Sequence, residues 1–300
     1  MLVAAELWVV GMAIWAIGGR SPIFAAGMHH VDFTAVALSP IAAGATPHVV
    51  VDDVRSRVSV GVSNDQLVHV RDLTRMSGMI FSSRAYPQLH VERTPDGVRI
   101  ERPSVENLAI DMFGYSTQSI EVLVPSGSRV DIARCAGANV AGIDGGVSVH
   151  SQDGHVKLAD LQGDVDARSD DGYIEAANVR GDRLAMASMD GHLGLQDVSV
   201  GSLSATTHDG RIEARGLSFA GERPDATLHT ADGSIRIQLV PNADLTIDAA
   251  TDDGRIYVDG SSQDSDGSAQ RTIRLGSGTG KMTVGTSDGS IRILTNGVPQ

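Results

Sequence analysis

Apolar residues recur at every second position between Val147 and Leu217, and this alternation itself repeats along the chain. On both sides of each Asp-Gly pair the apolar residues lie two apart, which is the period of a half-buried strand and not that of a helix. Each copy is therefore predicted to be a strand, a turn, a strand and a second turn. The copies are marked by glycines spaced 18, 19 and 19 residues apart, at Gly154, Gly172, Gly191 and Gly210.

The constant spacing predicts how the copies pack. A unit of about 19 residues is too small to bury its own apolar face, so successive units must stack against one another. An antiparallel hairpin array would also place an Asp-Gly pair in a tight turn. The second corner in every copy and the fixed columns favour a coil that always winds in one direction. We therefore predict an all-β chain that forms a parallel β-solenoid (β-helix), with rungs of about 19 residues.

The repeat predicts which side chains fill the coil, and the same columns continue outside the central copies. The coil is expected to begin near Val130, and after Leu217 its columns return at 226–237, 247–258 and 282–293. The polar stretch Gly260 to Gln270 should form a surface loop, and Asp72 to Gln88 a second one, because neither has an apolar period. The central columns are Val147, Val165, Leu184 and Leu203; Val149, Ala167, Met186 and Ala205; Val156, Ile174, Leu193 and Ile212; and the hydroxyl residues Ser151, Ser169, Ser188 and Thr207.

An apolar segment precedes the repeats. Leu2 to Gly19 carries one charge, Glu6, and as a helix it would span about 27 Å, close to the thickness of a hydrocarbon core. We predict that residues 1–20 form one N-terminal apolar helix that serves as a membrane anchor or an uncleaved signal. A cleaved signal peptide and a buried soluble helix stay open as alternatives, although the basic region of a signal peptide is missing. The further divisions are a spacer at 21–47, an N-terminal β region at 48–125 and solenoid repeats at 126–295.

Composition narrows the functional classes. The chain is 41% hydrophobic but only 4% aromatic, which suits a thin coil filled by small aliphatic side chains. Its formal net charge of -13 argues against nucleic acid and anionic membrane surfaces as partners. The single cysteine, Cys135, excludes an intramolecular disulfide and is expected to be a buried thiol.

Motifs for catalysis or cofactor binding are missing from the sequence. It has no phosphate-binding loop, no metal-ligand spacing and no nucleophile elbow. His155 and His192 share an outward column but stand two rungs apart, about 9.6 Å, which is too far to share a metal. We therefore predict no enzyme activity, no catalytic residue, no cofactor and no metal site.

Glycoside cleavage needs two carboxyl groups close together on one outward face, and the outward columns offer no tight pair. The column after the central isoleucine contains Lys157, Glu175, Gly194, Glu213, Arg236, Tyr257 and Arg292. The outward column on the other sheet contains Ser148, Asp166, Ala185, Ser204, Thr227, Asp248 and Thr283.

The aspartates of the Asp-Gly pairs should stack along one edge of the coil. Aspartate is a turn residue in its own right, so each is expected to bond to its own corner. Calcium bridging successive rungs is the alternative hypothesis. The column contains Asp153, Asp171, Asp190, Asp209, Asp232, Asp253 and Asp288.

The repeat resembles a known family. The motif D-V-x-A-x-S-x-D-G-x-I-x-A-x-x-V-x-G at Asp164 to Gly181, with a strand that ends at Pro125 before the coil, is similar to the bacterial putative-adhesin family of β-strand-repeat domains. The resemblance covers residues 48–294, and the function of this domain family is largely unknown. It implies an envelope-attached stalk or binding surface behind an N-terminal membrane segment, and it supplies no catalytic residues.

Together these observations predict a non-enzymatic protein of the bacterial cell envelope, anchored to the membrane through residues 1–20 with its β domain outside the cytoplasm. It would act as an adhesin-like, scaffold or envelope-stress-sensing surface, with an envelope protein or glycan as its partner. A polysaccharide-active parallel β-helix and a periplasmic partner-binding module of a signalling system are the alternatives.

Overall fold

The computed structural model describes residues 27–33, 35–82, 88–103, 110–263 and 268–295. These residues form strands joined by turns and contain no helix, which confirms the predicted all-β class. The predicted apolar helix in residues 1–20 lies outside the described residues. Within the described ranges, no helix has the length and apolar character to cross a membrane.

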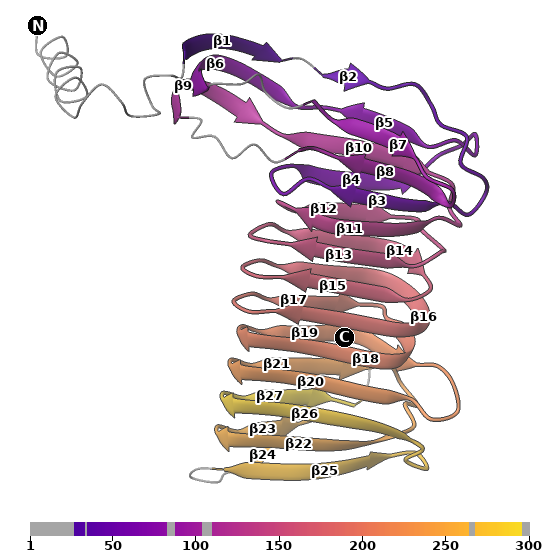
Figure 1. Ribbon diagram of the computed structural model, residues 1–300. Coiled ribbons are helices and arrows are strands. Elements are labelled where there is room, and N and C mark those ends of the chain that lie inside the picture. The colour runs from indigo at the N-terminus through magenta and orange to yellow at the C-terminus, as the bar shows by residue number, and fades with distance from the viewer. Residues whose placement is uncertain (1–26, 34, 83–87, 104–109, 264–267, 296–300) are drawn as a thin grey trace, which may run out of the picture.

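The strands stack from one end of the molecule to the other (Figure 1). Their bounds are β1 Gly27–Phe33, β2 Val36–Ala37, β3 His48–Asp52, β4 Arg57–Val62, β5 His69–Asp72, β6 Arg75–Ser82, β7 His90–Arg93, β8 Gly97–Glu101, β9 Ile110–Thr117, β10 Ser119–Val124, β11 Arg129–Cys135, β12 Ala138–Ala141, β13 Val147–Ser151, β14 Val156–Gln162, β15 Val165–Ser169, β16 Ile174–Ser188, β17 Leu193–Gln196, β18 Ser199–Asp209, β19 Ile212–Phe219, β20 Asp225–Asp232, β21 Ile235–Leu239, β22 Leu245–Asp253, β23 Ile256–Val258, β24 Ser261–Gln263, β25 Ala269–Leu275, β26 Gly280–Asp288 and β27 Ile291–Leu294.

The central repeats pair in parallel with the predicted register. Val165 pairs with Val147 of the preceding rung, and Ile174 with Val156, so each rung repeats after one sequence period. The first sheet contains β11, β13, β15, the second half of β16, β18 and β20. The second sheet contains β12, β14, the first half of β16, β17, β19 and β21. Both predicted strand columns are therefore confirmed.

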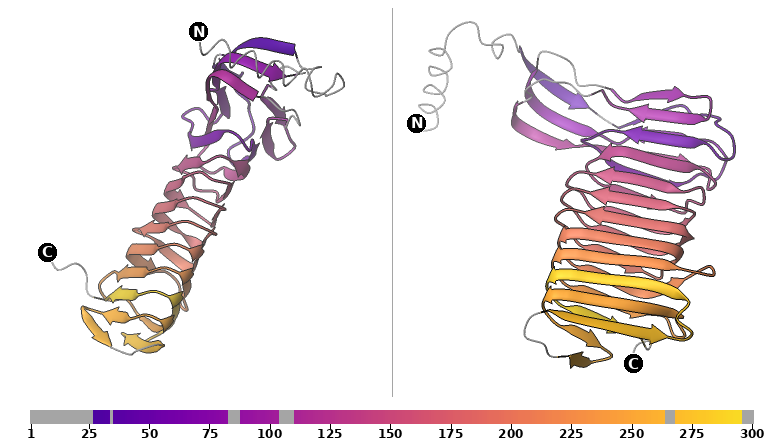
Figure 2. Two further views of the ribbon diagram at one scale, coloured as in Figure 1. Left: turned by 90° about the vertical axis from the view of Figure 1, so that its left-hand side faces the viewer. Right: turned by 60° about the horizontal axis from the view of Figure 1, so that its bottom comes forward.

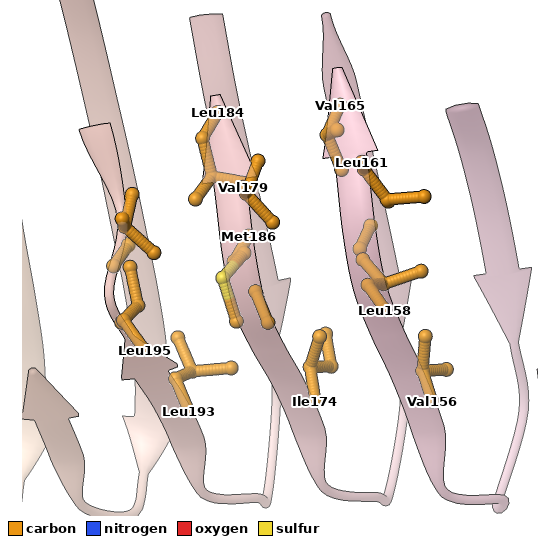
Figure 3. Packing of buried hydrophobic residues seen from close by; sticks show 14 of the residues in the cluster. Val156, Leu158, Leu161, Val165, Ile174, Val179, Leu184, Met186, Leu193 and Leu195 are labelled. Carbon is orange, nitrogen blue, oxygen red and sulfur yellow. The ribbon is translucent and has the colours of Figure 1, made fainter. Parts of the chain in front are cut away.

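The interior of the coil is a column of aliphatic side chains between the two sheets. Val156, Ile174 and Leu193 follow one another on three successive strands in Figure 3, and each is at most 1% exposed. Burying one such side chain contributes about 1.5–3 kcal/mol. Because every rung adds the same contacts, stability accumulates along the stack by nearest-neighbour packing.

The glycines of the Asp-Gly pairs are required by the close stacking of the turns. We expect a tight corner to favour glycine through a positive backbone φ, but Gly172, Gly191 and Gly210 are not among the positive-φ residues of the described chain. Instead, a Cβ on Gly191 would collide with the carbonyl oxygen of Gly172, and a Cβ on Gly210 with that of Gly191. The explanation by φ is wrong at these positions, where the space between successive turns admits only glycine.

The hydroxyl column holds these turns in place. Thr207 Oγ1 lies 3.0 Å from the carbonyl oxygen of Gly191, and Thr230 Oγ1 lies 3.2 Å from that of Gly210. Both side chains are buried, and each hydroxyl donates to the turn of the preceding rung. The Ser/Thr column thus supplies a partner for a turn carbonyl that would otherwise be buried without one.

The N-terminal region continues the stack and adds a small side sheet. β3 and β4 pair in parallel with β11 and β12, so the parallel pairing extends into residues before the first repeat. β1, β6 and β9 form a separate three-stranded antiparallel sheet beside this end of the stack (Figure 2). Two expectations are corrected here: β6 occupies part of the predicted 72–88 loop, and β1 and β2 lie in the predicted 21–47 spacer. The ladder partners of these strands come from other parts of the chain, so the repeat period does not mark them.

The C-terminal rungs are not stacked in the order of the sequence. β26 pairs with β20 on one side and β22 on the other, and β27 lies likewise between β21 and β23 (Figure 1). The chain therefore skips one rung, forms the last one and returns to fill the gap.

The end of the stack is covered by two antiparallel strands. β24 pairs with β23 and β25 with β22. Residues 260–270 were expected to be a surface loop, but 261–263 and 269–270 belong to these strands, so the expectation is wrong there. The physical reason is that an open sheet edge exposes unpaired N–H and C=O groups, and a polar strand can cover it.

Candidate functional site

The outward face of the second sheet carries a cluster of aromatic and basic side chains. Two of its outward columns line the site, one just after the turn glycine and one after the buried residue that follows. In the first column lie His155, Tyr173, His192 and Arg211. Paired strands place the second column in the order Lys157, Glu175, Gly194, Glu213, Arg236, Arg292 and Tyr257.

Three rings form a ladder on successive rungs. The Tyr173 ring centroid lies 5.1 Å from that of His155 and 5.1 Å from that of His192, with tilts of 55° and 39°. Tyr173 is 48% exposed, so its phenol group is available to solvent. The two histidines stand on either side of Tyr173 as the repeat predicts, and the ring between them occupies the space that a shared metal would need.

A hollow lies beside this ladder where Gly194 has no side chain. It has a volume of about 260 Å³ and is lined by His155, Tyr173, Glu175, His192, Leu193, Gly194, Arg211 and Glu213. We call it the ring groove. Glu175 and Glu213 face it from two rungs that are separated by the rung of Gly194. The groove thus combines aromatic surface, two hydrogen-bond acceptors and one guanidinium.

Basic side chains lie next to both carboxylates of the ring groove. Glu175 lies 3.6 Å from Lys157 Nζ and 3.6 Å from His155 Nε2. Glu213 Oε1 lies 2.7 Å from Arg215 Nη2 and 3.5 Å from Arg236 Nη1. Exposed ion pairs of this kind contribute little to stability, so these side chains remain available for a ligand.

The structure gives no close carboxylate pair on this face. The rungs of Glu175 and Glu213 are about 9.6 Å apart, and each of the two carboxylates already has a lysine or arginine neighbour. Among the described residues, no group of three His, Cys, Asp or Glu side chains could hold a metal ion. What the arrangement offers chemically is recognition by stacking, hydrogen bonds and charge.

The predicted aspartate column is present, in the order that the strands impose. Asp209 pairs with Asp232, Asp232 with Asp288, and Asp288 with Asp253. His208 lies beside this edge, with Nδ1 3.0 Å from Asp209 Oδ1. The hydrogen bond to Asp209 and its charge raise the pKa of His208 above its usual value.

A buried ionic cluster at the N-terminal end was missed by the sequence reasoning. Arg102 Nε lies 2.7 Å from Asp53 Oδ2, and Arg102 Nη2 lies 2.9 Å from Asp72 Oδ2, with all three side chains at most 4% exposed. Ser56 and Thr74 complete the cluster by hydrogen bonds to these aspartates. The only signal in the sequence is charge at positions next to strand ends, which does not identify the partners. The cluster is buried, and its ion pairs connect the chain segments that contain Asp53, Asp72 and Arg102.

Cys135 lies in the interior of the coil, as expected. Its thiol is fully buried and donates to the carbonyl oxygen of His150 at 3.6 Å. Burial raises the pKa of the Cys135 thiol. The thiol is therefore an unreactive packing group.

Comparison with known proteins now identifies the family. Residues 101–294 match the model of the Toastrack DUF4097 family, more than half of the chain. The chain belongs to this family. The resemblance seen in the repeat motif is thereby confirmed, and Toastrack DUF4097 is a domain of unknown function. No curated protein matches the chain.

Several solved structures are similar to this Toastrack chain at low identity. A protein from Parabacteroides distasonis, described as a putative lipid binding protein, has 12% identity and a TM-score of 0.45, with 88% of this chain and 94% of that chain covered. A putative adhesin from Bacteroides fragilis has 12% identity and a TM-score of 0.43, with coverages of 89% and 97%. A second Parabacteroides distasonis protein, a putative adhesin, has 9% identity and a TM-score of 0.33, with coverages of 89% and 97%.

Proposed function

We propose that this chain is a non-enzymatic, adhesin-like binding scaffold of the bacterial cell envelope, and that the outward face of its second sheet is the binding surface. The observation that carries the proposal is the ring groove. It brings exposed aromatic rings, carboxylates and a guanidinium together on a rigid sheet, which is the composition of a recognition site. The regular coil supports that face over its whole length and fixes the distances between its side chains.

The location is part of the proposal. The apolar run in residues 1–20 would anchor the chain to the membrane, with the β domain outside the cytoplasm. The partner is then an envelope glycan or an envelope protein within reach of the anchored coil. Deleting residues 1–20 should move the protein from the membrane pellet to the soluble fraction and leave its β signal in circular dichroism unchanged. Persistent pelleting of a folded truncation would refute the anchor.

Binding through the ring groove is tested by filling it. A Cβ on Gly194 would meet nothing nearer than Glu175 Cγ at 3.6 Å, so a side chain fits there without strain. Gly194→Gln should reduce the capture of envelope glycan or protein in a pull-down from envelope extract. Ala185→Gln, which places the same side chain on the outward face of the first sheet, is the matched control. Equal capture by both variants would contradict the proposed surface.

A glycan array followed by product analysis separates the proposal from its alternatives. Retention of a glycan without cleavage supports the binding scaffold. Turnover that is lost in Glu175→Gln or Glu213→Gln would replace the proposal with a polysaccharide-active enzyme. Capture of a single envelope protein, with no glycan bound, would favour the partner-binding module of a signalling system.

A further inference from the structure

The return of the chain at the C-terminal end places two arginines side by side. Tyr257 precedes Arg292 in the sequence. Because β27 lies between β21 and β23, however, Arg292 pairs directly with Arg236, and Tyr257 lies on the other side of Arg292. Both arginines are exposed. The Arg292 guanidinium lies 5.1 Å from the centre of the Tyr257 ring. We call Arg236 and Arg292 the arginine pair.

This part of the face is basic, although the whole protein has a formal net charge of -13. The outward positions of β19, β21 and β27 carry Arg215, Arg236 and Arg292 against one carboxylate, Glu213. Arg215 holds Glu213 at 2.7 Å, whereas Arg236 is 3.5 Å from it. Arg211 adds a fourth guanidinium at the edge of the ring groove. The local surplus of positive charge favours an anionic ligand.

From this geometry we infer that the face binds a linear acidic polysaccharide, whose carboxylates pair with Arg236 and Arg292 and whose neighbouring sugars occupy the ring groove. A guanidinium fork matches a carboxylate in a bidentate contact. Glu175 and Glu213 accept hydrogen bonds from sugar hydroxyls, and the Tyr173 and Tyr257 rings provide apolar surface beside them. The inference rests on the proposed binding role of the same face and names the class of its ligand.

The spacing of charge favours a polysaccharide over nucleic acid. Successive rungs are about 4.8 Å apart, so the four guanidiniums of this region are spread over three rungs. Double-stranded DNA carries one charge per about 1.7 Å of its axis, far more than these side chains neutralise. A chain that carries hydroxyl groups between its carboxylates fits a face on which two adjacent arginines are followed by Glu213 and the ring groove.

The inference is tested by isothermal titration of the full chain with a galacturonate oligosaccharide and with its methyl ester. The ester keeps the sugar skeleton and removes the charge. The acid should bind and the ester should not. Arg236→Gln and Arg292→Gln should each weaken binding of the acid by about tenfold, which corresponds to the loss of one charged hydrogen bond. Gly194→Gln, which fills the ring groove, should weaken it as well.

Arg168→Gln is the matched control, because Arg168 is an exposed arginine on the outward face of the first sheet. It should leave the affinity unchanged. Equal binding of acid and ester, no binding of the acid, or equal losses in Arg168→Gln and Arg236→Gln would each overturn the inference. Binding of polyglutamate or single-stranded DNA as tight as that of the galacturonate would also overturn it, because it would indicate unspecific attraction of anions. Capture of envelope material that depends on Gly194 but not on either arginine would leave the proposed function intact and reject the acidic ligand.

Discussion

Thr207 Oγ1 lies 3.0 Å from the carbonyl oxygen of Gly191, in the turn one rung before it. The contact repeats along the coil wherever a threonine occupies this column, as at Thr230 and Thr286. Each hydroxyl joins two rungs at the place where the strands end and ladder hydrogen bonds stop. The Ser/Thr column is therefore a second, side-chain ladder that runs parallel to the backbone ladder.

Removing one hydroxyl of this ladder should destabilise the fold. Thr207→Val keeps the shape but leaves the Gly191 carbonyl with one fewer partner in a buried site, at a cost of about 1–3 kcal/mol. Thr206→Val is the control, because Thr206 is exposed on the outward face, where such changes stay within about 0.5 kcal/mol. Urea denaturation of the two variants and the parent measures the difference. Equal midpoints for the two variants would show that the hydroxyl ladder is dispensable.

Two glycines three residues apart should differ sharply in their tolerance of alanine. A Cβ on Gly191 collides with the backbone of Gly172, whereas a Cβ on Gly194 makes only ordinary contacts. Gly191→Ala should therefore cost several kcal/mol, about 3 or more, because successive turns must move apart. Gly194→Ala should change the free energy of unfolding by less than about 1 kcal/mol, because a glycine inside a strand is itself slightly destabilising relative to alanine. Thermal unfolding followed by circular dichroism decides, and similar melting temperatures would contradict the stacking clash.

The buried ionic cluster should be the most sensitive charged site in the described chain. Arg102→Met leaves Asp53 and Asp72 buried without their guanidinium, and breaking such a cluster costs about 3–5 kcal/mol. Arg134→Met removes an exposed pair with Asp52 and should cost at most about 1 kcal/mol. The comparison uses the midpoints of chemical denaturation. A cost for Arg102→Met as small as that for Arg134→Met would mean that the cluster does not fasten this end of the coil.

The sequence predicts the coil well because its signal is local and repeated. Val156, Ile174 and Leu193 keep one phase over several copies, and this phase fixes both the buried face and the register of the rungs. The predicted glycine positions were right for a reason that a single copy cannot reveal. The conflict between Gly191 and Gly172 arises between rungs and not within the turn.

One further column of the repeat also marks the structure, although the sequence prediction did not use it. Asp160, Asn178 and Asp197 have φ values of 54°, 53° and 53°, and the next residue of the column is a glycine. Asp, Asn and Gly are the residues that tolerate the left-handed region, so their recurrence at the repeat period marks the second corner. In the structure Asn178 Nδ2 also donates to Asp160 Oδ1 at 2.6 Å. Searching the repeat for this residue class would have located the corner.

The order of the last rungs could not be predicted from the sequence. The copies at 247–258 and 282–293 match the same columns equally well, and periodicity contains no information on which of them pairs with β20. β24 and β25 cover this end of the coil by antiparallel pairing with β23 and β22, and the repeat period does not reveal that cap. The proposed binding face depends on that choice, because the arginine pair exists only when Arg292 follows Arg236.

The corner that allows the chain to return should be sensitive to acid. Asp244 accepts hydrogen bonds from Ser277 Oγ at 2.6 Å and from the backbone N–H of Gly278 at 2.6 Å, with Thr279 as a further donor. These donors favour the charged carboxylate and lower the pKa of Asp244 from 3.8 to about 2. A carboxylate whose pKa is lower in the folded state stabilises that state at pH values above its unfolded pKa. This contribution is therefore complete above about pH 4 and is lost as the pH falls toward 2.

Asp244→Asn should unfold at lower denaturant than the parent at pH 6, and the two denaturation midpoints should converge between pH 4 and pH 2. Asp225→Asn, a change at an exposed aspartate at the start of β20, serves as the control and should follow the pH dependence of the parent. A constant difference between Asp244→Asn and the parent from pH 6 to pH 2 would show that the carboxylate charge does not hold this corner.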